Sequence, residues 1–512
     1  MTKTDTTSRP RYLDLWDYKS VNWCPEKPPV DDGWEEQKKN EFCKELQKAI
    51  NANPDDILLL YSSGDDGNIP DIVQREKDKK SLLRSSSGTP ELFSKNADVS
   101  DEGLRVNGLA GILHFQNTTV YIHSRFDHSK ENSSIAKAGD KSVYADRFLS
   151  YILRHIGIPA VLMHRCAPTS GNDLISLLLP RLFLKQLTNA FSQGFYRQYQ
   201  TVEYNGCRVR GHIDVARHIR LNPMKNGRIA YSAREYTVDN PLNHLILAAY
   251  GVLRRSYSAQ LDTYLQNEPE LSRPIAMLET QLGREDISPT SLRRLIAEAK
   301  DPVTHPMLRD YEALRKMAMQ ILRFEGKNPF LHSEGDDGGS VSGILVSMPR
   351  VWERMLESRL STILSDIGQQ SFHILENRRE IIPDLLSRST GAVFDAKYKE
   401  SWERVYQKEL EKDAEGGQIN WGYQGVREDV FQILSYMYVL NCRIGGVIHP
   451  WTDKRQYEAK SFQVSNALSN HNFILLPFAI PSGEMDQQSY DDLMDESAKK
   501  LEKWIRDILE TS

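Results

Sequence analysis

Hydrophobic and polar positions divide the chain into three regions, of which the first is residues 1–125. Apolar residues recur at helical spacing within 34–50. Two alternating runs, 109–115 and 118–126, predict strands. Residues 63–103 are rich in Ser, Asp, Gly and Lys and hold few apolar anchors, which is typical of a flexible stretch. We therefore expect a mixed α/β region interrupted by one flexible segment.

The middle region, 126–345, combines helices with one long β-hairpin. Helical patterns cover 143–157, 172–192 and 255–326, and Asp239-Asn240-Pro241 marks a further helix start. Two alternating segments, near 207–221 and 226–236, flank the turn signal Asn-Pro-Met-Lys-Asn-Gly. Strands of that length would project about 35 Å at about 3.3 Å per residue. This is more than a tight turn requires, so we expect a protruding stalk.

The C-terminal region, 346–512, follows a segment, 328–343, with the composition of a linker. Its pattern reads helix, strand, strand, helix, strand, strand, helix, which is typical of an α/β domain. A length of 512 residues also favours about three domains. The expected fold class is therefore multidomain α/β.

Composition restricts the class of protein. The formal net charge of −5 excludes a uniformly basic protein that coats nucleic acid, although a local basic patch remains compatible with it. The N-terminus lacks the apolar core of a signal peptide, and the apolar runs are too short to cross a bilayer. The cysteines form no CxxC pair, which favours a reducing cytoplasm over a disulfide framework or a zinc site. These scattered cysteines are Cys24, Cys43, Cys166, Cys207 and Cys442.

Candidate chemistry gathers in EIIPDLLSRSTGAVFDAKYK, where two strands are expected around Ser-Arg-Ser-Thr-Gly. Asp384 ends the first predicted strand and Asp395 lies in the second. Lys397 follows two residues later and so shares a face with Asp395. Carboxylates hold Mg²⁺, and an ammonium group can orient or deprotonate a water or neutralise a phosphate, as phosphodiester hydrolysis requires. The alternative is an exposed Asp395–Lys397 ion pair in an ordinary hairpin.

Two flanking helices add polar residues to this pattern. Glu353 lies beside the apolar stripe of the helix before the strands, where a carboxylate needs a partner. That partner is either a metal ion or one of the neighbours Arg350 and Arg354. Downstream, Gln432 and Tyr436 lie one turn apart on a second amphipathic helix, where the alternative is a helix surface with a half-buried tyrosine. The complete order is a helix with Glu, a strand with Pro-Asp, a strand with Asp-x-Lys and a helix with Gln-x-x-x-Tyr. This order is much less likely to arise by chance than any one of its parts.

This order resembles the PD-(D/E)xK nuclease fold, in the subgroup with a Gln-x-x-x-Tyr helix. The match extends to the McrC family, the nuclease subunits of modification-dependent McrBC restriction systems, through PDLL…FDAKYK…REDVFQILSYMYVL and the central segments between 194 and 250. The resemblance covers about 194–450. It implies Mg²⁺, or Mn²⁺ in its place, with metal ligands and catalytic residues among Asp384, Asp395, Lys397, Glu353, Gln432 and Tyr436. It also implies no nucleotide site in this chain, and no GxxxxGK[ST] motif occurs.

The predicted hairpin tip carries a basic cluster with no acidic residue between 215 and 234. The cluster consists of Arg217, Arg220, Lys225 and Arg228. It either contacts the DNA backbone, docks onto a partner, or forms a solvated turn. The resemblance implies the second role, because McrC-like subunits insert a stalk into the pore of the hexameric AAA+ GTPase McrB. Asp214 is expected to brace one of the arginines.

The expected function is therefore the endonuclease subunit of a restriction system that acts on double-stranded DNA modified at cytosine. Two alternatives remain. One is a free-standing or site-specific nuclease of the same fold, which needs no GTPase partner. The other is a non-catalytic subunit that only stimulates the partner, which the intact set of Asp384, Asp395 and Lys397 disfavours.

Overall fold

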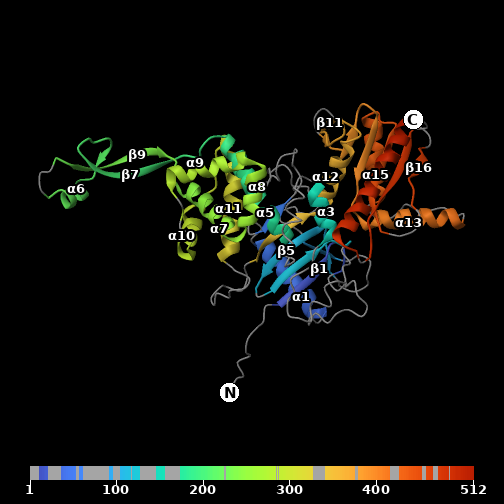
Figure 1. The fold of residues 1–512 in the computed structure, drawn as a ribbon, viewed down its shortest axis with the longest axis horizontal. Coiled ribbons are helices and arrows are strands. Elements are labelled where there is room, and N and C mark those ends of the chain that lie inside the picture. Colours follow the sequence, from blue (N-terminus) through green and yellow to red (C-terminus); the bar gives the residue numbers. More distant parts are fainter. Residues whose placement is uncertain are drawn as a thin grey trace, which may run out of the picture.

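Three bodies of structure, a sheet, a helical part and a second sheet, form the mixed α/β architecture in the computed structural model (Figure 1). Of the helices described, none combines the length and apolar character needed to span a lipid bilayer. The structure describes residues 11–20, 36–52, 57–60, 92–95, 104–116, 118–126, 146–155, 173–223, 227–283, 285, 288–326, 341–374, 379–415, 426–452, 457–464, 471–483 and 485–511.

The first sheet has five strands in the order β1-β6-β5-β10-β2. The predicted strands 109–115 and 118–126 are confirmed as an antiparallel pair, β5 and β6, and the predicted helix 34–50 is confirmed as α1. The flexible stretch predicted for 63–103 lies outside the described residues except at 92–95. The elements of this part are β1 (Arg11–Trp16), α1 (Glu36–Ala52), β2 (Ile57–Leu60), β3 (Phe93–Lys95), β4 (Leu104–Val106), β5 (Leu109–Phe115), β6 (Thr118–His123) and α3 (Arg147–His155).

Strand β10 (Val341–Ser347) joins this first sheet although it lies far along the chain. It pairs antiparallel with β5 and parallel with β2. The predicted linker 328–343 therefore overlaps a strand at 341–343, and the rest of it lies outside the described residues. The predicted boundary at 345/346 also falls within β10. The sequence did not predict this strand's place because the helical part is inserted between β10 and the other strands of its sheet.

The helical part confirms the predicted helices between 172 and 326. Its central helix begins where Asp239-Asn240-Pro241 predicted a start: the Asn240 side chain accepts a hydrogen bond from the Asn243 amide, and Pro241 fits the first turn, where no amide donor is needed. The helices are α5 (Asp173–Ser192), α7 (Pro241–Ser256), α8 (Ser258–Asn267), α9 (Arg273–Leu282), α10 (Pro289–Glu298) and α11 (Arg309–Gly326), with 3₁₀ turns η3 (Pro269–Ser272) and η4 (Pro306–Leu308).

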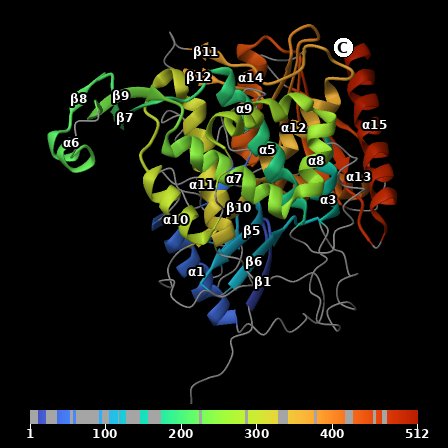
Figure 2. The same ribbon diagram turned by 60° about the vertical axis from the view of Figure 1, so that its left-hand side comes forward.

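A hairpin of β7 (Gln198–Gly206) and β9 (Ile229–Thr237) projects from the helical part, with α6 (Val215–Leu221) at its far end (Figures 1 and 2). Nine paired residues reach about 30 Å at about 3.3 Å per residue. The predicted partner strand over 207–221 is wrong: only β8 (His212–Ile213) is extended there. Asp214 accepts a hydrogen bond from the Arg217 amide and so caps a helix.

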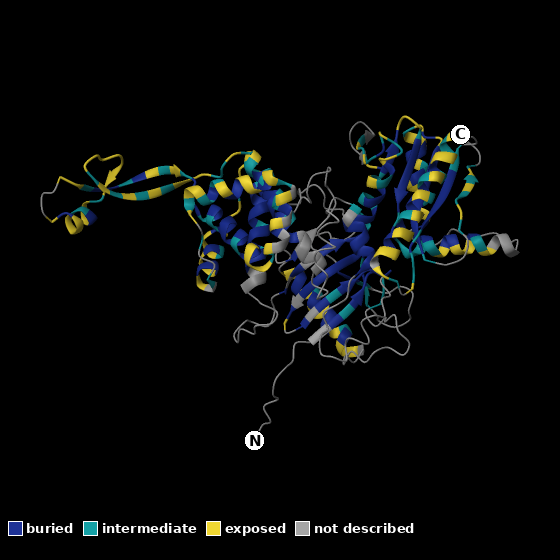
Figure 3. Cartoon of the chain, in the orientation of Figure 1, coloured by how far each residue is buried: buried dark blue, intermediate teal, exposed yellow. Residues whose placement is uncertain are grey.

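The second sheet has the order β13-β14-β15-β17-β16, with β14, β15 and β17 parallel and the two edge strands antiparallel. Every residue of β14 and β15 is buried, and Figure 3 shows these strands as the buried centre of this part. The elements are α12 (Met348–Leu360), β11 (Phe372–Ile374), β12 (Arg379–Ile381), β13 (Leu385–Ser387), β14 (Ala392–Ala396), α13 (Glu400–Glu415), α14 (Val426–Val439), β15 (Ile444–Trp451), β16 (Lys460–Gln463), β17 (Asn472–Ala479) and α15 (Gln487–Thr511).

Alternation along β14 decides where its polar residue points. Ala392, Phe394 and Ala396 belong to the apolar cluster that includes α12 and α15. Val393 belongs to the opposite cluster, which includes α13 and α14. Successive side chains of a strand point to opposite faces, so Asp395 faces the α13–α14 layer. The first cluster also contains residues of α3, α5, α7 and α11, so one core continues through all three parts.

Candidate active site

The two candidate aspartates lie on neighbouring strands of the second sheet. Asp395 is in β14, as predicted. Asp384 directly precedes β13, so its predicted place at the end of a strand is wrong. β13 pairs antiparallel with β14, with Leu385 opposite Phe394, and this register brings Asp384 beside the end of β14. The Asp384 carboxylate accepts a hydrogen bond from the Ala396 amide at 3.0 Å.

The carboxyl groups of Asp384 and Asp395 lie close enough for each to change the pKa of the other. Burial raises the pKa of Asp384 well above its usual value, and the nearby charges of Asp395 and Glu353 raise it further. Burial acts in the same direction on Asp395, but the Lys397 ammonium and the hydrogen bond with Asp384 outweigh burial and lower the pKa of Asp395. Of the two carboxyls, the environment therefore favours the protonated form more strongly at Asp384 than at Asp395.

Lys397 lies at the centre of the charged groups. Its Nζ is 2.6 Å from Asp395 Oδ2 and 3.4 Å from Asp429 Oδ1, and it donates to Gln432 Oε1 at 3.4 Å. Burial by itself lowers the pKa of Lys397, but the charges of Asp395, Asp429 and Asp384 outweigh burial and raise it above the usual value. Lys397 is thus a permanently charged ammonium group in this arrangement.

Helix α14 supplies the remaining polar groups. Gln432 Nε2 donates to the Tyr436 hydroxyl at 2.7 Å, so the predicted pair shares one helix face and reaches Lys397 through Gln432. Burial raises the pKa of Tyr436, whose ring belongs to the apolar cluster beneath α14.

Asp429 is the site residue that sequence reasoning missed. It accepts from Lys399 Nζ at 2.9 and 3.1 Å and from Trp402 Nε1 at 2.9 Å, in addition to its contact with Lys397. The signal was present, because Asp429, Gln432 and Tyr436 are spaced i, i+3 and i+7 and so lie on one helix face.

Glu353 approaches the site from α12. Its nearest charged partner is Arg350, whose Nη1 lies 2.5 Å from Glu353 Oε2, which is one of the two alternatives weighed above. Burial raises the pKa of Glu353, with Arg350 acting against it and Asp395 adding to it. The Glu353 carboxylate is thus close enough to sense Asp395, while Arg350 neutralises it. Its role as a metal ligand stays a prediction.

The donor groups fit a hard divalent cation. The neighbouring carboxyl groups of Asp384 and Asp395 offer the oxygen ligands that such a cation prefers, and a bound cation would compete with protons for them. Three His, Cys, Asp or Glu side chains do not come close enough to hold one ion anywhere in the described ranges. Mg²⁺ commonly uses one or two carboxylates and completes its shell with water and phosphate oxygens, so the pair is a sufficient anchor.

The hairpin residues are not all brought to the surface. Arg217 is only 9% exposed: it forms an ion pair with Glu203 and donates to the carbonyls of Tyr204 and Tyr231, each at 2.8 Å. Its predicted contact with a partner or DNA is therefore wrong, since it secures α6 against the hairpin. Asp214 lies 3.9 Å from it, as the predicted brace.

The other basic residues of the tip differ in placement. Arg220 and Arg228 are exposed, and Lys225 lies outside the described residues. Between them the tip presents an apolar surface that the sequence reading had not noted. This tip patch consists of Val215 and Ile219, which lie one turn apart on α6 and are 63% and 67% exposed; Ile213 and Leu221 nearby are also exposed.

Solved structures and a family model match this chain. A Thermococcus gammatolerans assembly of McrB AAA+ hexamers with bound McrC aligns over 97% of this chain and 100% of the other, at 14% identity and a TM-score of 0.43. The McrBC complex of the same organism aligns over 68% and 87%, at 15% identity and a TM-score of 0.28. No curated protein matches the sequence. The family model of the McrBC 5-methylcytosine restriction system component matches residues 104–450. Since this match spans more than half of the sequence, the chain belongs to the family of McrBC 5-methylcytosine restriction system components.

Proposed function

We propose that this protein is the DNA-cleaving subunit of a restriction system, a metal-dependent endonuclease of the PD-(D/E)xK type. The observation that supports this most directly is the contact of Asp384, Asp395 and Lys397 at the ends of two paired strands. In an ordinary exposed hairpin, an Asp-x-Lys pair would be solvated. Here the groups are buried, and burying two carboxyls side by side costs free energy. Proteins place such buried titratable groups together most often at functional sites.

Asp384 and Asp395 would hold Mg²⁺, with Mn²⁺ as a substitute, and Glu353 is the further ligand that the family pattern proposes. The cation would supply Lewis-acid polarisation of the scissile phosphate and a more acidic bound water. Lys397 carries a raised pKa, so it acts as a fixed positive charge. It would bind and orient the phosphate and offset developing negative charge, or orient the attacking water.

Gln432 and Tyr436 would hold Lys397 in place. The Tyr436 hydroxyl accepts from Gln432, which leaves the Gln432 carbonyl oxygen directed at the Lys397 ammonium. Asp429 is a second carboxylate beside the ammonium, at 3.4 Å, and also pairs with Lys399. The three α14 residues therefore act as one support for the lysine, whose rotamers would otherwise be numerous.

The β7–β9 hairpin is proposed as the part that docks onto a GTP-hydrolysing AAA+ partner, which would also select DNA modified at cytosine. The hairpin stands clear of the remaining fold, and the tip patch exposes large apolar side chains where a solvated turn would be polar (Figure 2). An apolar tip favours contact with a protein over contact with a DNA backbone, which needs positive charge.

Cleavage of cytosine-methylated plasmid by the purified protein with its partner, GTP and Mg²⁺ tests this proposal. Asp395→Asn is expected to abolish cleavage while leaving stimulation of the partner's GTPase activity intact. Cleavage by Asp395→Asn at the wild-type rate would show that the site is assigned wrongly. Partner-independent cleavage would indicate a free-standing nuclease, and GTPase stimulation without any cleavage by the wild type would indicate a non-catalytic coupling subunit.

A further inference from the structure

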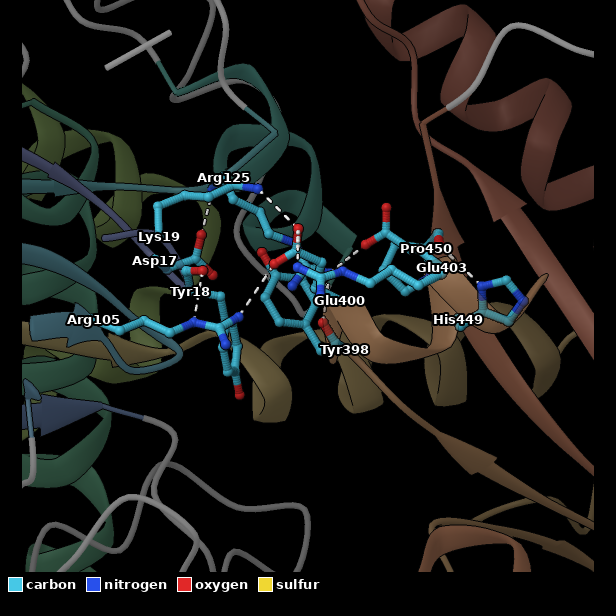
Figure 4. A network of polar contacts seen from close by, with 11 residues as sticks. Asp17, Tyr18, Lys19, Arg105, Arg125, Tyr398, Glu400, Glu403, His449 and Pro450 are labelled. Carbon is cyan, nitrogen blue, oxygen red and sulfur yellow. Dashed lines mark hydrogen bonds and ion pairs between the residues drawn. The ribbon is translucent and has the colours of Figure 1, made fainter. Parts of the chain in front are cut away.

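The segment that follows Lys397 leaves the second sheet and enters the first part of the fold. Tyr398 is fully buried, in the cluster shared with Phe126, Phe148 and Trp352. Figure 4 shows the polar contacts around it, with Asp17, Arg105 and Arg125 of the N-terminal part on one side and Tyr398, Glu400 and Glu403 on the other. The N-terminal residues, for which the sequence suggested no role, therefore reach the immediate neighbour of the proposed catalytic lysine.

Arg125, just beyond β6, is the central group of these contacts. Its Nη2 donates to the Tyr398 carbonyl at 2.6 Å and to Glu403 Oε1 at 2.7 Å. The guanidinium carbon lies 4.6 Å from the ring centres of both Tyr398 and Phe126. The Arg125 backbone amide donates to the Asp17 carboxylate. The side chain is only 2% exposed. If these partners were lost, water could not take their place around the charged guanidinium group.

The backbone on both sides of Lys397 is thereby fixed. The Lys397 amide donates to the Ile448 carbonyl of β15 at 2.9 Å, which ties the residue to its own sheet. The carbonyl of the following residue, Tyr398, accepts a hydrogen bond from Arg125, which ties the chain to the N-terminal part of the fold. The first contact belongs to the regular sheet pattern, but the second depends on one side chain from another part of the fold.

We propose that Arg125 is a positioning residue for the nuclease site, holding the backbone beyond Lys397 so that the ammonium group meets the scissile phosphate. This inference rests on the proposed endonuclease function. The inference gives the N-terminal part of the fold a role in cleavage, because Arg125 from this part fixes the backbone at Tyr398, next to Lys397. Displacement of a catalytic group by about 1 Å costs up to about a hundredfold in rate, so even a small shift of this backbone is measurable.

A second set of contacts joins the same two parts without touching the Tyr398 carbonyl, and it provides the matched control. Glu400 pairs with Arg105 and with Lys19, each at 3.2 Å. The Arg105 side chain also donates to the Tyr18 carbonyl at 2.9 Å. Removal of Arg105 thus loses an ion pair between the two parts and a carbonyl contact, as removal of Arg125 does, but the carbonyl belongs to Tyr18 and not to the segment that carries Lys397.

The test compares Arg125→Met with Arg105→Met in the full protein with its partner. Arg125→Met is expected to lower the single-turnover cleavage rate about tenfold or more, while DNA affinity and GTPase stimulation stay within about twofold. Arg105→Met is expected to cleave at the wild-type rate. Wild-type cleavage by Arg125→Met, or an equal loss in both variants, would overturn the positioning role. Parallel loss of DNA affinity and GTPase stimulation would likewise overturn it, because a structural defect affects every readout.

Two further variants keep the test decisive if Arg125→Met does not fold. Arg125→Lys keeps the charge, but its side chain ends one bond short of the Nη2 atom that donates to both acceptors, so it is expected to cleave more slowly than wild type. Glu403→Gln removes the ion pair but leaves the Tyr398 carbonyl contact, so it is expected to cleave within about threefold of wild type. If Glu403→Gln falls as far as Arg125→Lys, the ion pair and not the backbone contact matters, and the inference fails. Failure of the proposed function itself is separate, since then wild type would not cleave either.

Discussion

Asp429→Asn is the substitution whose effect can be worked out most fully from the structure. The carboxylate lies 3.4 Å from Lys397 and 2.9 Å from Lys399, and it accepts from the Trp402 indole at 2.9 Å. An asparagine has the same shape and can still accept from Trp402 through its amide oxygen. The substitution therefore removes one negative charge beside two ammonium groups and leaves the packing unchanged.

The magnitude follows from the distance. Two unit charges 3.4 Å apart interact by about 5 kcal/mol at an effective dielectric of about 20. Lys397 keeps its closer partner Asp395 at 2.6 Å. We therefore expect less than half of this interaction energy to appear as an increase in the activation free energy. We expect a loss of about 2 kcal/mol, which corresponds to about a thirtyfold lower kcat. The KM for DNA is expected to change little, because Asp429 is buried and does not face solvent.

The assay is steady-state cleavage of methylated plasmid at saturating partner, GTP and Mg²⁺. Glu428→Gln is the matched control, since Glu428 precedes Asp429 in the first turn of α14 but is exposed. Thermal unfolding of both variants establishes that they are folded at the assay temperature. If Asp429→Asn retains wild-type kcat, or if Glu428→Gln loses as much, the view that α14 supports Lys397 through Asp429 is refuted.

Three further predictions address the metal, the hairpin and the buried acid of the first sheet. Mg²⁺ or Mn²⁺ is expected to raise the melting temperature of wild type but not of Asp384→Asn; an equal rise in both would refute the carboxylate anchor. Ile219→Asp is expected to abolish GTPase stimulation while Arg220→Ser retains it, and the reverse result would favour a basic docking surface. Burial raises the pKa of Asp17 to about 7, so the folded protein keeps a proton that the unfolded chain releases near pH 4, and stability falls as pH rises to 7. In urea unfolding, the stability of Asp17→Asn relative to wild type should rise by about 3 kcal/mol between pH 5 and pH 8, and parallel pH curves would contradict this.

Relations within a few residues of one another were predictable from the sequence. The two-residue spacing of Asp395 and Lys397 placed them together, and the four-residue spacing of Gln432 and Tyr436 placed both on one helix face. These are properties of a strand and a helix, so they hold in whatever fold contains them. The same logic failed over 207–221, where the alternating pattern indicated a strand but the Asp214 cap and the following residues form α6.

Relations across the chain were not predictable, because periodicity carries no information about distant partners. Strand β10 pairs with β5 across more than two hundred residues, and nothing in its sequence names that partner. Arg125 was unremarkable in sequence, yet it contacts the Tyr398 carbonyl, 273 positions away. Asp429 had the right helical spacing, but only the structure shows that Lys397 and Lys399 both point toward it.

The charge balance of the site explains why a divalent cation suits it. Asp384, Asp395 and Asp429 oppose the two ammonium groups of Lys397 and Lys399, while Glu353 is neutralised by Arg350. With all carboxyls ionised, one negative charge is in excess, which would repel the phosphodiester anion of DNA. Burial and the neighbouring carboxylates raise the pKa of Asp384, a change in the direction that relieves this excess. A divalent cation bound by the carboxylates would leave one positive charge instead, and that charge would match the single negative charge of the substrate phosphate.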